Sequence, residues 1–238
     1  MAKTTGLDTR IYVEGTDLSG DVSGLTGVGM SQNLYDVTTL DLSAVARLAG
    51  LKTGSTSCAA FFDNAAGKGH AIWTAKSGAI PTDSENVLIP LGGSIGDPAL
   101  ELVAKQGTYN VTRETSGPIT CSVDYESADG LSPDFGVLLT PKATDSSGTS
   151  YTGVDGTAQS TGGARAMIQV FSLTSGSVTA TIEDSADNVT YGTLGTFTSI
   201  SGQTSEAIEI SGTVERYVRL TTSGTFSTAV LACSFVRL

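Results

Sequence analysis

The stretch Pro141-Lys142-Ala143-Thr144-Asp145-Ser146-Ser147-Gly148-Thr149-Ser150 separates two parts of the chain that differ in character. Before it, strand-like segments of uneven length alternate with long glycine-rich connections and one helix-like segment. After it, short strand-like segments recur at intervals of about eight to twelve residues, which is typical of an antiparallel sandwich. A polar run with proline, glycine and serine has the composition of a linker. The sequence therefore predicts two β-rich modules in tandem.

The module boundaries follow from this break. We expect residues 1–142 to form the first module, residues 143–164 to hold the linker and the start of the second, and residues 165–238 to form the second. The expected fold is mainly β: a β-sandwich or half-barrel with one helix, then an antiparallel β-sandwich. A chain of 238 residues with 39% hydrophobic and 16% charged residues can bury two such cores.

The charge balance argues against nucleic-acid binding. The chain has 13 lysines and arginines against 24 aspartates and glutamates, a net charge of −11. Proteins that bind DNA draw much of their affinity from basic side chains that neutralise phosphates. We therefore expect a soluble protein that does not hold DNA.

Cysteine usage and the opening residues indicate where the protein is made. Cys58, Cys121 and Cys233 lie far apart and form no CxxC motif, which argues against zinc and redox sites and favours buried free thiols. Met1–Gly6 lacks the apolar run of a signal peptide, and no stretch reaches the roughly twenty apolar residues of a membrane span. These features predict synthesis in a reducing cytoplasm.

The sequence offers no catalytic constellation. His70 is the single histidine, and no serine stands in a GxSxG context. We expect no enzyme activity and no cofactor. Oxygen-bearing side chains gather at Asp184, Asp187 and Asn188, where either a calcium site or ordinary capping of a turn would use them.

The first module contains one long connection, Tyr35–Thr53. Its apolar segment Ala44–Leu51 predicts a short helical turn that ends at Gly50. Connections of this length usually have a function. The apolar segment either packs on its own domain or contacts a partner subunit, since exposed apolar patches mark interaction sites.

The other expected elements of the first module are strands over residues 10–14, 25–34 and 55–63, followed by a helix over Ala65–Lys76. A strand over residues 86–91, which Pro90 confines to an edge or an end, and a closing strand over residues 135–139 are also expected. In the second module we expect separate strands over residues 166–173, 178–183, 195–200, 206–210, 216–220 and 229–237.

Two long strands near the middle of the first module pair with each other. Residues 100–114 alternate in polarity, and residues 119–126 return after a turn at Ser116-Gly117-Pro118. In the returning strand the odd-numbered residues from Ile119 to Tyr125 are apolar, whereas the even-numbered ones from Thr120 to Glu126 are polar. One face of this pair is therefore expected to be buried and the other exposed.

Several short motifs follow one another in a fixed order. They are Ile11-Tyr12-Val13-Glu14-Gly15-Thr16-Asp17-Leu18-Ser19-Gly20-Asp21-Val22-Ser23, Tyr35-Asp36-Val37-Thr38-Thr39, Ala49-Gly50-Leu51-Lys52-Thr53-Gly54, Phe61-Phe62-Asp63-Asn64 and Phe135-Gly136-Val137-Leu138-Leu139. In this order, over most of residues 8–142, the chain resembles the major tail tube protein of long-tailed bacteriophages.

The resemblance implies a structural virion protein that forms hexameric rings stacked into a hollow tail tube. Genomic DNA passes through the tube without specific binding, and the tape measure, tail terminator and distal tail proteins are implied partners. The tube is assembled in the host bacterial cytoplasm. The long connection would reach the next ring, so the implied contact residues are Tyr35, Val45, Arg47, Leu48 and Leu51. The implied lumen residues are Thr120, Asp124 and Glu126, and an acidic lumen would weakly repel DNA.

The second module resembles the Ig-like or galactose-binding-like decoration domains of such tail proteins. The residues behind this are Val178–Asp187, Asn188-Val189-Thr190-Tyr191 and Arg216-Tyr217-Val218-Arg219-Leu220. The resemblance implies an outward appendage that touches cell-surface glycans or serves as a structural ornament.

Two other functions fit the composition. A carbohydrate-binding module or adhesin would use Trp73, Tyr191 and Tyr217 as stacking residues, although the aromatic content is only 6%. A capsid decoration protein would share the acidic, glycine-rich character. Purified behaviour separates these classes, because a tube subunit forms rings or tubes.

Overall fold

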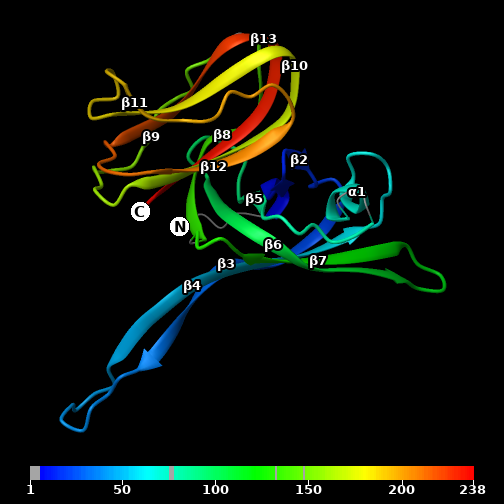
Figure 1. Cartoon of the computed structure of the whole chain (residues 1–238), viewed down its shortest axis with the longest axis horizontal. Helices are drawn as coiled ribbons and strands as arrows, with labels where there is room; N and C mark the ends of the chain where they lie inside the picture. The colour runs from blue at the N-terminus through cyan, green and yellow to red at the C-terminus, as the bar shows by residue number, and fades with distance from the viewer. Residues whose placement is uncertain (1–5, 75–77, 132, 147) are drawn as a thin grey trace.

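The computed structural model describes residues 6–74, 78–131, 133–146 and 148–238. As expected, the chain is mainly β, and its strands join one large antiparallel sheet (Figure 1). No helix in these ranges is long and apolar enough to cross a membrane. The elements are η1 Gly6–Asp8, β1 Tyr12–Val13, β2 Thr16–Asp17, β3 Val22–Asp36, β4 Arg47–Phe61, α1 Gly69–Trp73, β5 Glu85–Pro90, β6 Pro98–Arg113, β7 Ile119–Ser127, β8 Asp134–Asp145, β9 Val154–Asp155, β10 Ala164–Ser185, β11 Gly192–Thr196, β12 Thr204–Ile210 and β13 Tyr217–Arg237.

The strands are paired in one main path with a branch that leaves it at β6. The main path runs β11-β10-β13-β8-β6-β5-β1-β2, with β12 added to β10 and β9 to β13. A second branch leaves β6 and runs β6-β7-β4-β3. In Figure 1 the strands β9 to β13 form the upper body, the β6–β7 and β3–β4 hairpins form two arms below it, and α1 lies beside the junction.

The branch β6-β7-β4-β3 has one buried and one exposed face, as the alternation in residues 119–126 predicts. Cys58 and Ala60 of β4 and Cys121, Val123 and Tyr125 of β7 are all almost fully buried. They pack in one core with Trp73 of α1, Leu100 and Leu102. Burying one face of a sheet under a helix leaves the other face free.

The helix is shorter than expected. The sequence predicts Ala65–Lys76, but α1 covers only Gly69–Trp73, and residues 75–77 lie outside the described ranges. Lys68 has an extended backbone, with φ −103° and ψ 171°, so the helix cannot begin before Gly69. Gly67 and Gly69 are both poor helix formers, which explains the loss of the first turn.

The predicted helical turn in the long connection is wrong. Residues 47–51 of that segment belong to β4, which pairs with β3 in a long hairpin. The pair Asp36 and Arg47 lies next to the tip of the hairpin, and the pair Val22 and Ala60 lies at its base. Only residues 37–46 form the connecting tip. The apolar residues at 44–51 resemble a helix in composition, but extended pairing to β3 determines their conformation.

The upper body contains two strands that are far longer than expected. Residues 166–173 and 178–183 are parts of β10, and residues 217–220 and 229–237 are parts of β13. These strands pair along almost their whole length. In the middle of β10, Ser175 and Gly176 adopt φ of 57° and 78°, so the strand changes direction there.

This change of direction lets β10 and β13 contribute to two opposed sheets. The first part of β10 pairs with β12 and the last part with β11, while β13 pairs with β9 near its start and with β8 near its end. Between them lies a core that includes Ile168, Val178, Leu220 and Leu231. A sandwich is thus built from two bent strands rather than from many short ones.

The polar stretch 141–150 is not a free linker. Its first half continues β8, which runs unbroken through Asp145 and pairs with β13 from Val137 to Asp145. Strand β8 therefore crosses the predicted module boundary at 142/143. The division into residues 1–142, 143–164 and 165–238 remains a prediction, but the two halves share a continuous sheet.

Side chains from both halves also share a core. Tyr12, Leu88 and Leu138 from the first half pack with Met167 and Ala232 from the second. Beside this core, the buried Arg165 donates from Nε to Glu101 Oε2 at 3.1 Å, and both side chains are at most 3% exposed. The second half is therefore docked on the first.

The β1–β2 turn supplies a further contact between the halves. The Gly15 N–H donates to Gln169 Oε1 at 2.7 Å, and Gln169 Nε2 donates to the Asn86 carbonyl at 2.9 Å. Gly15 has φ +70°, and a Cβ at this position would lie 2.6 Å from the Val170 carbonyl oxygen and 2.8 Å from that of Thr204. Only glycine fits this approach without strain.

Candidate assembly surface

The β3–β4 hairpin is the most apolar exposed feature of the described chain. It carries more than half of the exposed large hydrophobic side chains, among them Met30, Leu34, Val37, Leu40 and Leu42. Leu40 at the tip is fully exposed. A monomer rarely exposes apolar surface of this extent without a partner, so this arm is a candidate interaction surface.

The structure places all five predicted contact residues on this hairpin. Tyr35, Val45, Leu48 and Leu51 are 57%, 62%, 61% and 83% exposed, and Arg47 is exposed too. Tyr35 lies opposite Leu48 in the strand pairing, whereas Val45 is in the tip. Their position on a projecting arm excludes the alternative that this segment packs into the core of its own domain. Their role as contacts remains a prediction.

The predicted lumen residues share the exposed face of the β6-β7-β4-β3 sheet. Thr120, Asp124 and Glu126 of β7 alternate with the buried Cys121, Val123 and Tyr125, so their side chains point away from α1. Most of their neighbours across the strands are small and polar, but Thr120 lies opposite the exposed Phe61. The small polar neighbours include Ser55, Ser57, Thr108, Asn110 and Thr112.

Charge on this face is sparse, with the carboxylates of Asp124 and Glu126 and the ammonium of Lys105 in the paired strands β7 and β6. Asp124 accepts hydrogen bonds from the Ser57 and Thr108 hydroxyls, both at 2.6 Å, and these two bonds hold the pKa of its carboxyl below the usual value. Glu126 lies opposite Lys105 in the pairing of β7 with β6. The face is therefore largely polar and carries few charges, and its role as an acidic lumen remains a prediction.

Both edges of this sheet lack a strand partner within the described residues. Strand β3 pairs only with β4, and the 105–113 part of β6 pairs only with β7. Strand β3 contains no lysine, arginine or proline and includes several glycines. Proteins often protect long edges with lysine or proline, which β3 lacks, or with β-bulges, and the pairing of β3 with β4 shifts register at three places. The edge of β3 is therefore a candidate site for pairing with another chain.

Residues predicted for sugar binding are unsuited to it. Trp73 is fully buried. The Tyr191 ring lies under the Arg219 guanidinium at 3.8 Å, and the Tyr217 ring under that of Arg216 at 4.9 Å. One face of each ring is thus already covered. The Arg216–Tyr217 contact joins neighbours in the sequence, whereas the Arg219–Tyr191 contact joins residues far apart in the chain and could not be foreseen from the sequence.

The acidic turn of the second half caps its own backbone. Asp187 Oδ1 accepts from the N–H groups of Val189 and Thr190 at 2.9 and 2.8 Å, and Asp184 Oδ2 accepts from the Glu215 N–H at 2.7 Å. Over the described ranges, no group of three or more His, Cys, Asp or Glu side chains could hold a metal ion. These contacts favour the capping interpretation over calcium.

The single histidine and the cysteines have structural surroundings. His70 Nδ1 lies 2.8 Å from the Tyr109 hydroxyl and its ring packs on Phe62. Cys58, Cys121 and Cys233 are buried free thiols, as expected. Burial raises the pKa of the Cys58 thiol to about 12, which suppresses its reactivity.

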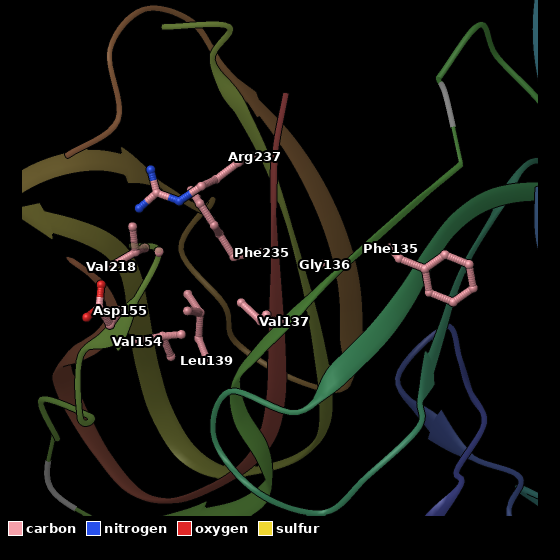
Figure 2. A pocket seen from close by; sticks show the side chains of 10 residues that line it. Phe135, Gly136, Val137, Leu139, Val154, Asp155, Val218, Phe235 and Arg237 are labelled. Carbon is pink, nitrogen blue, oxygen red and sulfur yellow. The ribbon is translucent and has the colours of Figure 1, made fainter. Parts of the chain in front are cut away.

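A cavity of about 230 Å³ opens at one end of the upper body, between β8, β9 and β13. Figure 2 shows its apolar walls, with Asp155 and Arg237 at the rim and the Phe135 side chain directed away. Asp155 is bound by Arg216 through two hydrogen bonds, and Arg237 donates to the Val214, Glu215 and Arg216 carbonyls. The polar groups at the rim are therefore engaged in holding the fold together.

Comparisons with known proteins give likeness only at the level of structure. No family model matches the chain, and no curated protein matches it. The chain is similar to a protein in the virion of a native gene transfer agent particle, with 19% identity, a TM-score of 0.42, and coverage of 56% of this chain and 99% of that one. A chain in the tail of an empty gene transfer agent particle, refined with C6 symmetry, matches at 15% identity and TM-score 0.42, covering 56% and 98%. The Dit protein of phage SPP1, an adsorption hub component, matches at 10% identity and TM-score 0.39, covering 96% and 99%.

Proposed function

We propose that this chain is a major tail tube subunit of a long-tailed bacteriophage, acting by assembly and not by catalysis. The observation that carries the proposal is the β6-β7-β4-β3 sheet, which combines a largely polar, sparsely charged exposed face with two edges that have no strand partner within the described residues. The order of sequence motifs over residues 8–142 supports the same function.

Ring formation follows from the two edges. The outer edge of β3 in one copy pairs with the 105–113 edge of β6 in the next, and repetition around an axis closes a ring of six subunits. The sheets of all copies then form one continuous inner wall. The polar face lines the lumen, with α1 on the outside.

The lumen surface suits the passage of DNA. Serine, threonine and asparagine side chains hydrate the wall, and its few charges include no basic cluster that would hold phosphates. DNA therefore passes through without specific binding. Asp124 and Glu126 are expected to repel DNA weakly, and the Lys105 ammonium, which donates to the Thr82 carbonyl at 2.8 Å, forms no ion pair with either of them among the described residues.

The β3–β4 hairpin joins successive rings. Its apolar side chains become buried against the next ring, which explains why a single copy exposes them. The finished tube belongs to the virion tail and is assembled in the host cytoplasm. It meets the tape measure protein in its lumen and the terminator and distal tail proteins at its ends.

The upper body lies outside the wall as a docked domain, in a position to contact cell-surface glycans.

Electron microscopy of the concentrated protein tests the proposal. The native protein should form six-fold rings and hollow tubes. Leu40→Ser should give rings that do not stack. Val189→Ser, which removes a similarly exposed apolar side chain from the second half, should still give tubes. Tubes of normal length from Leu40→Ser would refute the stacking role, and a native protein that stays monomeric at high concentration would refute the tube assignment.

A further inference from the structure

The β6-β7-β4-β3 sheet has an exposed apolar surface at each of its two ends. One is the tip of the β3–β4 hairpin, residues 37–46, where Leu40, Leu42 and Val45 are exposed. The other lies on the β6–β7 hairpin, which extends past α1 on the side opposite the β3–β4 arm (Figure 1). Stacking of rings through the tip requires a surface on the next ring that receives it, and the second end is a candidate for that surface.

The second end carries an apolar patch on the face of the sheet that bears α1. Val111 and Ile119 are 49% and 40% exposed. Val111 lies opposite Cys121 in the pairing of β6 with β7, and Ile119 comes two residues before Cys121, so all three side chains share one face. The Phe62 N–H donates to the Ile119 carbonyl at 3.0 Å, which places Phe62 beside them. We call Phe62, Tyr109, Val111 and Ile119 the end patch.

The aromatic members of the end patch are fixed by their contacts. The Phe62 ring packs on that of His70, with centroids 4.9 Å apart, and His70 packs in turn on the Tyr109 ring at 5.6 Å. His70 Nδ1 and the Tyr109 hydroxyl are hydrogen-bonded at 2.8 Å, and the Tyr109 ring also lies 6.0 Å from the buried Trp73 ring. A surface that is already ordered loses little side-chain entropy when a partner binds.

Each end also carries a charge that finds no counter-ion within its own chain. Asp41 is the only charged residue of the tip. Arg113 lies opposite Ile119 and therefore on the face of the end patch. Neither of them forms an ion pair among the described residues. Glu114 follows Arg113 in the turn, as Arg47 follows the tip, so a second pair of opposite charges is available. Opposite charges at the two ends favour contact between them.

A shift along the sheet brings the two ends together. Strand β4 runs from Arg47, next to the tip, to Phe61, next to the end patch, and its 15 residues span at most about 50 Å. Copies that repeat in one orientation along a tube therefore place the tip of one ring against the patch of another. A contact between two different surfaces repeats without closing, as growth of a tube requires. This match between the ends of one chain favours a second copy over an unrelated protein.

We propose that the tip of the β3–β4 hairpin docks on the end patch of a copy in the next ring, with Asp41 facing Arg113. The inference rests on the proposed tube function and deepens it, because it names both sides of the contact between rings. The end patch uses side chains that stand out of the plane of the sheet, whereas ring closure uses the backbone edge of β6. The two contacts therefore do not compete.

Cross-linking of the full chain tests the docking site. Ser43→Cys in the tip and Ser116→Cys in the β6–β7 turn are conservative changes at exposed positions that leave the apolar side chains in place. The three native thiols are buried. A short bis-maleimide should link the two new thiols between copies and give a ladder of covalent oligomers in a denaturing gel. Ser43→Cys combined with Ser211→Cys, an exposed serine between β12 and β13, should give no ladder.

Charge reversal tests the orientation of the contact. Arg113→Asp alone, or Asp41→Arg alone, should raise by about tenfold the protein concentration at which tubes appear, because like charges then meet between rings. The double variant restores an attractive pair with the charges exchanged. It should form tubes close to the native concentration, which also shows that neither substitution prevents folding.

Failure of the docking site can be told apart from failure of the tube function. Tubes that grow while the 43/116 pair gives no ladder, or no more than the 43/211 pair, would overturn the docking site and leave the tube function standing. Native-like growth of both single charge variants, or a double variant that does not recover, would also overturn it. A native protein that forms neither rings nor tubes would refute the tube function, and the docking site with it.

Discussion

The buried carboxyl of Glu85 should make the stability of this protein depend on pH in an unusual direction. Most carboxyls that are perturbed by folding have a lowered pKa and stabilise the native state as pH rises. Glu85 has a raised one, about 7 against 4.5 for the free group. Between these values the native state binds more protons than the unfolded state, so its free energy of unfolding falls as pH rises.

The size of the effect follows from the shift. Each pKa unit corresponds to 1.36 kcal/mol, so a move from 4.5 to about 7 corresponds to roughly 3 kcal/mol. The stabilisation that the protonated Glu85 gives to the native state is fully present below pH 4.5. It declines as pH rises to about 7 and is lost above that pH. Glu85→Gln keeps the shape of the side chain but cannot ionise. It should therefore be more stable than the native protein by up to about 3 kcal/mol at about pH 8, and similar to it near pH 4.5.

Urea denaturation followed by Trp73 fluorescence measures the difference directly. Glu209→Gln serves as the control, because this residue is exposed on β12 and should leave the curve of stability against pH unchanged. The decisive quantity is the difference between Glu85→Gln and the native protein across the pH range. A difference that stays constant with pH would refute the assignment of a raised pKa to Glu85.

Three further predictions concern the fold. Gly15→Ala should lower the free energy of unfolding by at least about 2 kcal/mol, because the positive φ and the approach of two carbonyl groups exclude a Cβ. Gly20→Ala, where the space is open, should change the free energy of unfolding little. Equal urea midpoints for the two variants would contradict this prediction. Arg165→Met should lower the free energy of unfolding by about 3–5 kcal/mol, because Glu101 then stays buried without its cation. The double variant with Glu101→Met should recover most of that loss. If thermal unfolding shows that the effects of the two substitutions simply add, the two side chains do not act as a pair. The three thiols, Cys58 among them, should react with a disulfide reagent only after denaturation, and fast labelling of the native protein would show that they are accessible.

The parts of the fold that depend on local pattern could be predicted from the sequence. The alternation in residues 119–126 correctly separates the buried Val123 and Tyr125 from the exposed Glu126, because side chains alternate across any strand. The buried state of the cysteines followed from their apolar surroundings. The exposed apolar character of the β3–β4 arm was anticipated as one of two alternatives.

The parts that depend on pairing between distant segments could not be predicted. Residues 141–145 look like a linker in composition, yet they continue β8 because β13 offers an edge to pair with. Residues 47–51 look helical, yet they are extended because β3 lies beside them. In both cases the backbone hydrogen bonds of a partner strand outweigh weak local preferences.

The sequence by itself determined the β class, the acidic charge and the two-sided nature of the central strands, since these depend on composition and on a period of two residues. Tertiary structure alone decided that the two halves share one sheet and one core, that the hairpin projects from the body, and that Glu85 is buried beside Glu14. The physical reason is that burial and strand edges are properties of segments far apart in the chain, which acquire partners only when the whole chain has folded.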